Sequence, residues 1–206
     1  MLQTNHMTTH TEISHNSDDL ITLFADTFSE TQKVSLLGGA DEPLYLPARD
    51  DNPAEIHFRD DYFSSALHEI AHWCIAGAER RKQVDYGYWY VADGRDAQAQ
   101  EAFFKAEVKP QALEWLFSLA CDYPFRVSVD NVVAGEHESD WSYWEQLEQA
   151  KGHFQTLCYK QIVLWENSGL PQRGKLFMTA CANKYRQGIL PSIEELSNPE
   201  TEQKHA

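Results

Sequence analysis

Apolar residues recur every three or four positions in several stretches of this chain, and that spacing predicts amphipathic helices with one buried face. Pro110 suits the first turn of a helix, so residues 107–109 are expected to join two separate helices. Ser192 and Glu195, three residues apart, form a capping pattern for a last short helix. The predicted helices begin at residue 17 or 18 and then cover 63–77, 97–106, 110–120, 139–165, 175–186 and a short stretch after 192.

Short extended stretches are expected between the first two of these helices. Val34 to Leu37 ends at two glycines, Leu44 to Leu46 lies between two prolines, and Glu55 to Phe58 leads into the next helix. Residues 86–91 and 124–129 also have the composition of strands. A few short strands before a mostly helical C-terminal half predict a single α+β domain. Its expected bounds are residues 17–197, with a disordered segment at 1–16 and a flexible tail at 198–206.

The composition is that of a folded, acidic protein, with 42% hydrophobic residues and a net charge of -15 over 206 residues. An acidic surface argues against a nucleic-acid partner, which needs a basic face, and favours a cationic substrate. No apolar run reaches the roughly 18 residues of a membrane span, and the polar N-terminus lacks the apolar core of a signal peptide. A cytoplasmic protein without a membrane partner is therefore expected. The four scattered cysteines form no C-x-x-C pair and are expected to be buried free thiols.

One five-residue pattern, His68-Glu69-Ile70-Ala71-His72, lies inside the predicted helix 63–77. Four residues make just over one helical turn, so both imidazoles leave the same face about one pitch apart. That arrangement suits two nitrogen ligands on one ion of zinc, iron or nickel. The helix is supported by an apolar stripe on a different side, formed by Phe63, Ala66, Leu67, Ile70 and Cys74.

A third protein ligand is expected, because two histidines alone do not hold a catalytic ion tightly. Glu107 is preferred, since a carboxylate at the junction of two helices can point inward. Glu101 and Glu114 are expected on exposed helix faces, and His57 and His137 are alternatives without a spacing argument. The carboxylates considered downstream of the histidines are Asp85, Asp93, Asp96, Glu101, Glu107 and Glu114.

Two chemistries fit a site of two histidines and one carboxylate. In a zinc peptidase or other hydrolase, Glu69 would deprotonate a zinc-bound water that attacks a carbonyl. In a non-haem iron oxygenase, the same three ligands leave room for dioxygen and a substrate C–H bond. Ligand type alone does not choose between the two.

Five strings of residues, in this order along the chain, resemble the elongation factor P hydroxylase family. The resemblance covers roughly residues 34–131. The strings are D-E-P-L-Y-L-P-A from Asp41, S-A-L-H-E-I-A-H-W-C-I-A-G from Ser65, V-D-Y-G-Y-W-Y from Val84, D-G-R-D-A-Q from Asp93 and E-V-K-P-Q-A-L-E-W from Glu107.

The resemblance implies a monooxygenase-type enzyme that acts last in the maturation of elongation factor P, adding oxygen to a lysine that already carries a β-lysyl group. It implies His68, His72 and Glu107 as ligands of a metal ion, with iron expected and zinc or nickel as alternatives in a purified sample. Glu69 becomes a catalytic residue that handles protons or supports a ligand. Dioxygen and an unidentified reductant are the implied co-reactants. The alternatives left by the sequence are a zinc hydrolase and a non-catalytic protein that binds a translation factor.

Overall fold

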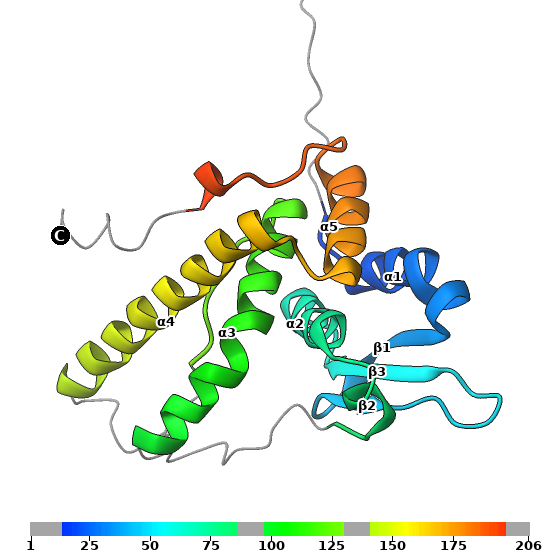
Figure 1. Ribbon diagram of the computed structural model, residues 1–206, viewed down its shortest axis with the longest axis horizontal. Coiled ribbons are helices and arrows are strands. Elements are labelled where there is room, and N and C mark those ends of the chain that lie inside the picture. Colours follow the sequence, from blue (N-terminus) through cyan, green and yellow to red (C-terminus); the bar gives the residue numbers. More distant parts are fainter. Residues whose placement is uncertain (1–13, 86–96, 130–140, 197–206) are drawn as a thin grey trace, which may run out of the picture.

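The computed structural model of this protein describes residues 14–85, 97–129 and 141–196 (Figure 1). Ten elements follow one another along the chain: α1 (Ser17–Gln32), β1 (Val34–Ala40), β2 (Leu44–Leu46), β3 (Ala54–Arg59), α2 (Phe63–Ile75), the 3-10 turn η1 (Arg80–Lys82), α3 (Ala97–Ala120), α4 (Trp141–Ser168), α5 (Gln172–Tyr185) and the 3-10 turn η2 (Ile193–Glu195). This is the predicted α+β architecture, with short strands in the N-terminal part and a helical C-terminal half.

The three strands form one small sheet in the order β1-β3-β2. β1 runs parallel to β3, with Val34 beside Ala54, whereas β2 runs antiparallel to β3, with Leu44 beside His57. Successive side chains of a strand point to opposite faces. Ala54, Ile56 and Phe58 of β3 are accordingly buried against the helices, while the residues between them are half-buried on the other face.

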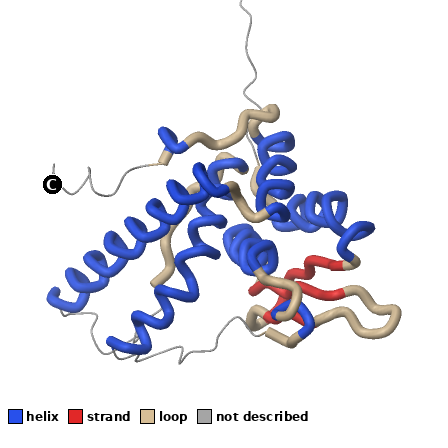
Figure 2. Tube along the Cα trace, viewed as in Figure 1, coloured by secondary structure: helices blue, strands red, loops and turns tan. Residues whose placement is uncertain are grey.

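Helix α2 lies at the centre of the molecule and contacts α3, α5, α1 and β3 (Figures 1 and 2). Figure 2 shows the strands gathered at one end while helices make up the rest. An aromatic cluster holds the centre together, because the Trp73 ring lies 5.4 Å from the ring of Phe24 and 4.9 Å from that of Phe28. Phe177 of α5 joins the cluster and lies 5.1 Å from Phe117 of α3. The predicted stripe of α2 is buried in this core.

The two helices predicted on either side of residues 107–109 are one continuous helix, α3, with Pro110 inside it. A proline in a helix interior lacks one hydrogen-bond donor and favours a helix start. Here tertiary packing outweighs that preference, since Pro110 and the ten residues that follow it are buried except for Leu119, which is half-buried. The prediction of a junction between two helices at Glu107 is therefore wrong.

Residues 124–129, predicted as a strand, form no regular secondary structure. A helix side chain takes the place of a strand partner, because the Gln111 amide donates to the Ser128 oxygen and accepts from the Ser128 nitrogen, both at 2.9 Å. The other predicted strand at 86–91 lies outside the described residues. Helix α4 buries Phe154 and Ile162, whereas Trp144 near its start is 41% exposed.

Several local predictions are confirmed. All four cysteines are free and buried, and Ser192 and Glu195 form the expected capping box. Most of the segment 1–16 and the tail from 197 lie outside the described residues. Within the first segment, His15 Nε2 lies 2.8 Å from the main-chain oxygen of Cys121. No helix in the described part of the chain is long and apolar enough to cross a membrane.

Candidate metal centre

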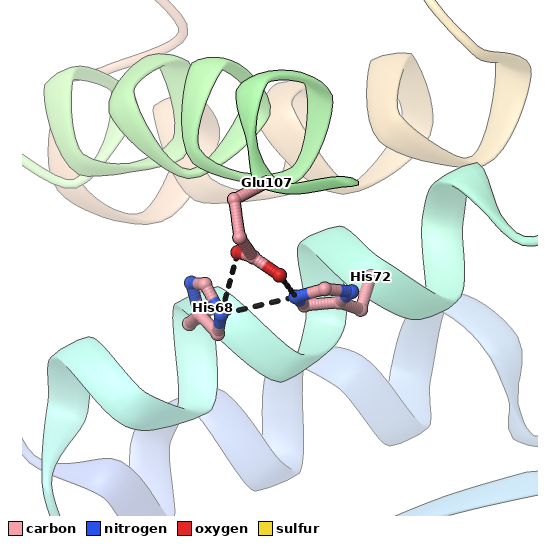
Figure 3. A group of neighbouring side chains, drawn as sticks. All are labelled: His68, His72 and Glu107. Atoms are coloured by element: carbon pink, nitrogen blue, oxygen red, sulfur yellow. Dashed lines mark hydrogen bonds and ion pairs between the residues drawn. The ribbon is translucent and has the colours of Figure 1, made fainter. Parts of the chain in front are cut away.

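The two histidines of α2 turn toward α3 because the opposite side of α2 is occupied by the buried apolar stripe. The four-residue spacing places the rings one turn apart, edge to face, and their Nε2 atoms lie 3.0 Å from each other (Figure 3). Both side chains keep limited exposure, 23% for His68 and 16% for His72. The predicted pair of imidazoles is therefore present and directed at one point.

Glu107 lies beside the two rings and comes from the middle of helix α3; its role as a third ligand stays a prediction. Its Oε1 lies 3.3 Å from His72 Nε2, and its Oε2 lies 3.5 Å from His68 Nε2. Figure 3 shows the carboxylate descending from α3 between the two rings. The three possible ligand atoms lie within 4.8 Å of one another, and these three residues are the one such group of histidine, cysteine and carboxylate side chains in the described parts of the chain.

The donor atoms fit a single ion. An ion about 2.1 Å from each ligand atom would set those atoms about 3.0 Å apart at a right angle and about 3.4 Å apart at the tetrahedral angle. The two Nε2 atoms are 3.0 Å apart, and the nearest Glu107 oxygens lie 3.3 Å from His72 Nε2 and 3.5 Å from His68 Nε2. These separations are close to the expected ones, with each histidine facing a different oxygen of the carboxylate. Two imidazole nitrogens and one carboxylate on one side of an ion are a donor set used by non-haem iron oxygenases and by zinc enzymes.

The other candidates from the sequence lie elsewhere. Asp85 accepts from Arg80 Nε at 2.6 Å, Glu101 is exposed and pairs with Lys105 at 2.7 Å, and His57 lies 2.9 Å from Glu55 on the sheet. Asp93, Asp96 and His137 lie outside the described residues.

Glu114 was placed on an exposed helix face by the sequence analysis, and that prediction is wrong. It is 8% exposed, and its Oε2 lies 2.7 Å from His68 Nδ1. A signal for it exists in the sequence. Four polar residues at helical spacing interrupt the apolar run of α3, and all four are buried: Glu107, Gln111, Glu114 and Ser118.

The charges around the histidines are strongly coupled. Burial works against a proton on His68, but the carboxylates of Glu114, Glu107 and Glu69 outweigh it and raise the pKa of His68 to about 10. For Glu69, burial raises the pKa above its usual value, and the two histidines only partly oppose this. A divalent ion at the Nε2 atoms would have to replace the extra proton, so ion binding and proton release are linked here.

A cleft opens beside His72 between α2, the sheet and the connection that follows α2. Its walls include Tyr45 and Ile56 from the sheet, Glu69 and His72 from α2, and Asp85. Within the described residues Glu69 makes no hydrogen bond. Of the residues that line this cleft, Glu69, His72 and Asp85 were candidates from the sequence, and Asp85 only as a metal ligand. The cleft itself has no sequence signal, because the strands and the connection meet only in the folded chain.

The family model of elongation factor P hydroxylase matches residues 23–195 of this sequence. A protein of Haemophilus influenzae named elongation factor P lysine hydroxylase is 39% identical to it over 174 residues, which are 84% of this chain and 91% of that protein. The chain belongs to the elongation factor P hydroxylase family. As a member of this family it is an enzyme, a hydroxylase, as predicted. Neither a zinc hydrolase nor a non-catalytic binding protein is supported.

Proposed function

We propose that this hydroxylase adds one oxygen atom to the β-lysylated lysine of elongation factor P, as the last step in the modification of that factor. The proposal places one ferrous ion between His68, His72 and Glu107. The observation that carries it is this group of two half-buried histidines and one buried glutamate, in a chain whose family and relative are named for hydroxylation of elongation factor P. A cytoplasmic location goes with the proposal, because a translation factor works there.

The reaction needs an electron donor besides dioxygen. One oxygen atom enters a C–H bond of the substrate, and the other leaves as water with two electrons and two protons from a reductant. When bound, the ion would supply the activation of dioxygen that no amino-acid side chain provides. The protein's own part is to hold the ligand set, to bind the modified lysine beside it and to move protons.

The cleft beside His72 supports a cationic substrate. An extended lysyl side chain carries an ammonium group, and the carboxylate of Glu69 faces this cleft without a hydrogen-bond partner among the described residues. Burial raises the pKa of Glu69, and a nearby ammonium would favour its ionised form again. Glu69 is therefore proposed to hold or release a proton as the substrate arrives, next to the histidine ligands.

The basic turn η1 offers a second contact with the protein substrate. Arg80 and Lys82 are exposed. They lie in the middle of the connection that lines the cleft, where an acidic surface of a partner can reach them. The overall charge of -15 is against attraction of an acidic protein at long range, so this contact has to be local.

The test is a mass measurement on the substrate. Purified protein is incubated with β-lysylated elongation factor P, ferrous iron, a reductant and air. A gain of one oxygen atom on the modified lysine is expected, with no gain on the factor lacking the β-lysyl group. The Glu107→Ala variant should lose tight iron binding and turnover together, whereas Glu101→Ala, on an exposed part of the same helix, should keep both. An unchanged mass with a fully iron-loaded protein would refute the proposal, and a cleaved substrate would replace it by the hydrolase.

A further inference from the structure

Helix α3 contacts His68 at both ring nitrogens. Glu107 lies at the Nε2 side, 3.5 Å away, and Glu114 lies at the Nδ1 side, 2.7 Å away. The two glutamates are seven residues apart, which places them on one face of the helix two turns from each other. The imidazole of His68 is thus held between two carboxylates from a single rigid element.

The contact at Nδ1 determines whether Nε2 carries a proton or a free lone pair. A neutral imidazole carries one proton, and a carboxylate that accepts from Nδ1–H leaves Nε2 with its lone pair free for an ion. The same contact fixes the ring orientation and makes the nitrogen ligand more basic. At 2.7 Å the Glu114 contact has the length of a charge-assisted hydrogen bond.

The second histidine lacks such support. Within the described residues, His72 forms its polar contacts through Nε2, to His68 and to Glu107. Its ring orientation depends on packing and on those contacts. Of the two histidines, His68 is therefore the one whose ring orientation is fixed by a contact at Nδ1.

Charge gives an independent reason for a carboxylate at this place. The side chains of Glu107 and Glu114 are only 3% and 10% exposed. Two buried carboxylates are costly unless a cation shares the site. A divalent ion at the Nε2 atoms would lie beside Glu107 and one imidazole ring away from Glu114, so it would offset part of both charges while the histidines stay neutral.

We propose that Glu114 is a positioning residue of the metal centre: it accepts a hydrogen bond from His68 Nδ1, turns Nε2 toward Glu107 and His72, and tightens ion binding without touching the ion. This inference rests on the metal centre of the proposed function. It assigns no new ligand and concerns the affinity and geometry of the site.

The experiment measures binding of Co²⁺ alone, without elongation factor P. The apoprotein of wild type, Glu114→Gln, Glu114→Ala and Glu101→Gln is titrated with Co²⁺, and affinity and visible spectrum are recorded. Removing a carboxylate behind a histidine ligand typically weakens metal binding about 10–100-fold. We expect that loss for Glu114→Ala and a smaller one for Glu114→Gln, whose amide oxygen still accepts from Nδ1–H. Glu101→Gln, on the exposed side of the same helix, should match wild type.

A second readout follows the ring itself. In the Zn²⁺-loaded protein with ¹⁵N-labelled histidine, wild-type His68 should carry its proton on Nδ1, and the Glu114→Ala variant should lose the slowly exchanging Nδ1 proton. The unfolding transition of the variant is measured alongside. If it is unchanged, the loss of the Nδ1 proton signal is not caused by a general loss of structure. Should Glu114→Ala fail to fold, the Glu114→Gln variant carries the same test.

The outcomes separate this inference from the proposed function. Wild-type affinity in folded Glu114→Ala, with an unchanged Nδ1 signal, would overturn the role of Glu114 and leave the metal centre intact. Failure of the wild type to bind Co²⁺ or Zn²⁺ would overturn the metal centre and this inference together. A lower Co²⁺ affinity in Glu114→Ala would support the positioning role of Glu114. If the iron-loaded wild type then failed to hydroxylate its substrate, only the proposed reaction would be refuted.

Discussion

Arg173 of α5 donates hydrogen bonds to the C-terminal end of helix α2, and its replacement should destabilise the protein. Its Nη2 donates to the main-chain oxygens of Trp73, Cys74 and Ala76 at 2.9, 3.1 and 2.5 Å. The guanidinium also lies 4.7 Å from the centre of the Trp73 ring. The last carbonyls of a helix have no partner within it and carry partial negative charge, so one cation here satisfies several of them.

The expected loss follows from these contacts. A hydrogen bond to a charged group contributes about 1.5–3 kcal/mol, and a cation on an aromatic face about 0.5–2 kcal/mol. The three oxygens share one nitrogen, and Arg173 is only half-buried, so the contributions do not add in full. Arg173→Met keeps an unbranched stem and removes all the donors. We expect it to lower the free energy of unfolding by about 2–4 kcal/mol.

Urea denaturation followed by circular dichroism measures this loss. Arg173→Lys keeps the charge but has a single nitrogen without the planar fork, so about half of the loss is expected. The control is Lys175→Met, which removes an exposed cation from the same helix and should change the free energy by less than about 0.5 kcal/mol. An Arg173→Met variant as stable as this control would refute the assignment of Arg173 as the anchor of α2.

Three further perturbations test the core, the charges and the cleft. Phe177 is fully buried in the aromatic cluster, so Phe177→Ala should cost about 3–5 kcal/mol in urea denaturation. The pKa of His68 is raised from 6.5 to about 10 in the folded apoprotein, so its stabilising effect is complete below pH 6.5 and lost as pH rises through about 10. With a chelator present, the free energy of unfolding of wild type should therefore fall over this range relative to His68→Gln, and parallel curves would contradict the charge coupling. Glu69→Gln should keep its iron content but lose about 100-fold or more in hydroxylation rate, and unaltered turnover would exclude Glu69 from proton transfer.

Helix α2 and its two histidines could be predicted from the sequence, because the pattern that defines them is local. The apolar stripe, the two histidines and their spacing all lie within the thirteen residues of α2. Both rings project from one face in any regular helix, whatever packs around it. The strands at Val34, Leu44 and Glu55 were likewise found from short local patterns, although β1 and β3 proved longer than predicted.

Glu107 lies beside the two histidines, where a third ligand was expected, but the structural reason for that expectation was wrong. Pro110 predicted a helix boundary beside Glu107, whereas α3 runs through it. The propensity of one residue was outweighed by burial of the turns that follow. The spacing of Glu107, Gln111 and Glu114 was the better signal, since polar residues that recur along one face of an otherwise buried helix need partners there.

The partner of Glu114 could not be predicted, because the two residues of that contact are 46 positions apart. The same holds for the cleft, whose walls come from β2, β3, α2 and the connection after it. Local patterns state which face of an element is polar. They do not state which face of another element meets it, since that depends on the packing of all the elements together.

The two histidines lie on α2 and Glu107 lies on α3, so their separation depends on how closely these helices approach. Two adjacent residues of α5 contact the two helices. Arg173 holds the end of α2, and Gly174 lies against α3, where an added Cβ would come within 2.9 Å of Leu113 Cδ2. The absence of a side chain at 174 thus lets α5 lie close to α3 while its neighbour reaches α2. A bulkier residue at 174 would press on the side chain of Leu113, which lies on the same helix as Glu107. The placement of Glu107 beside His68 and His72 therefore depends on the packing of α5 as well as on α2 and α3.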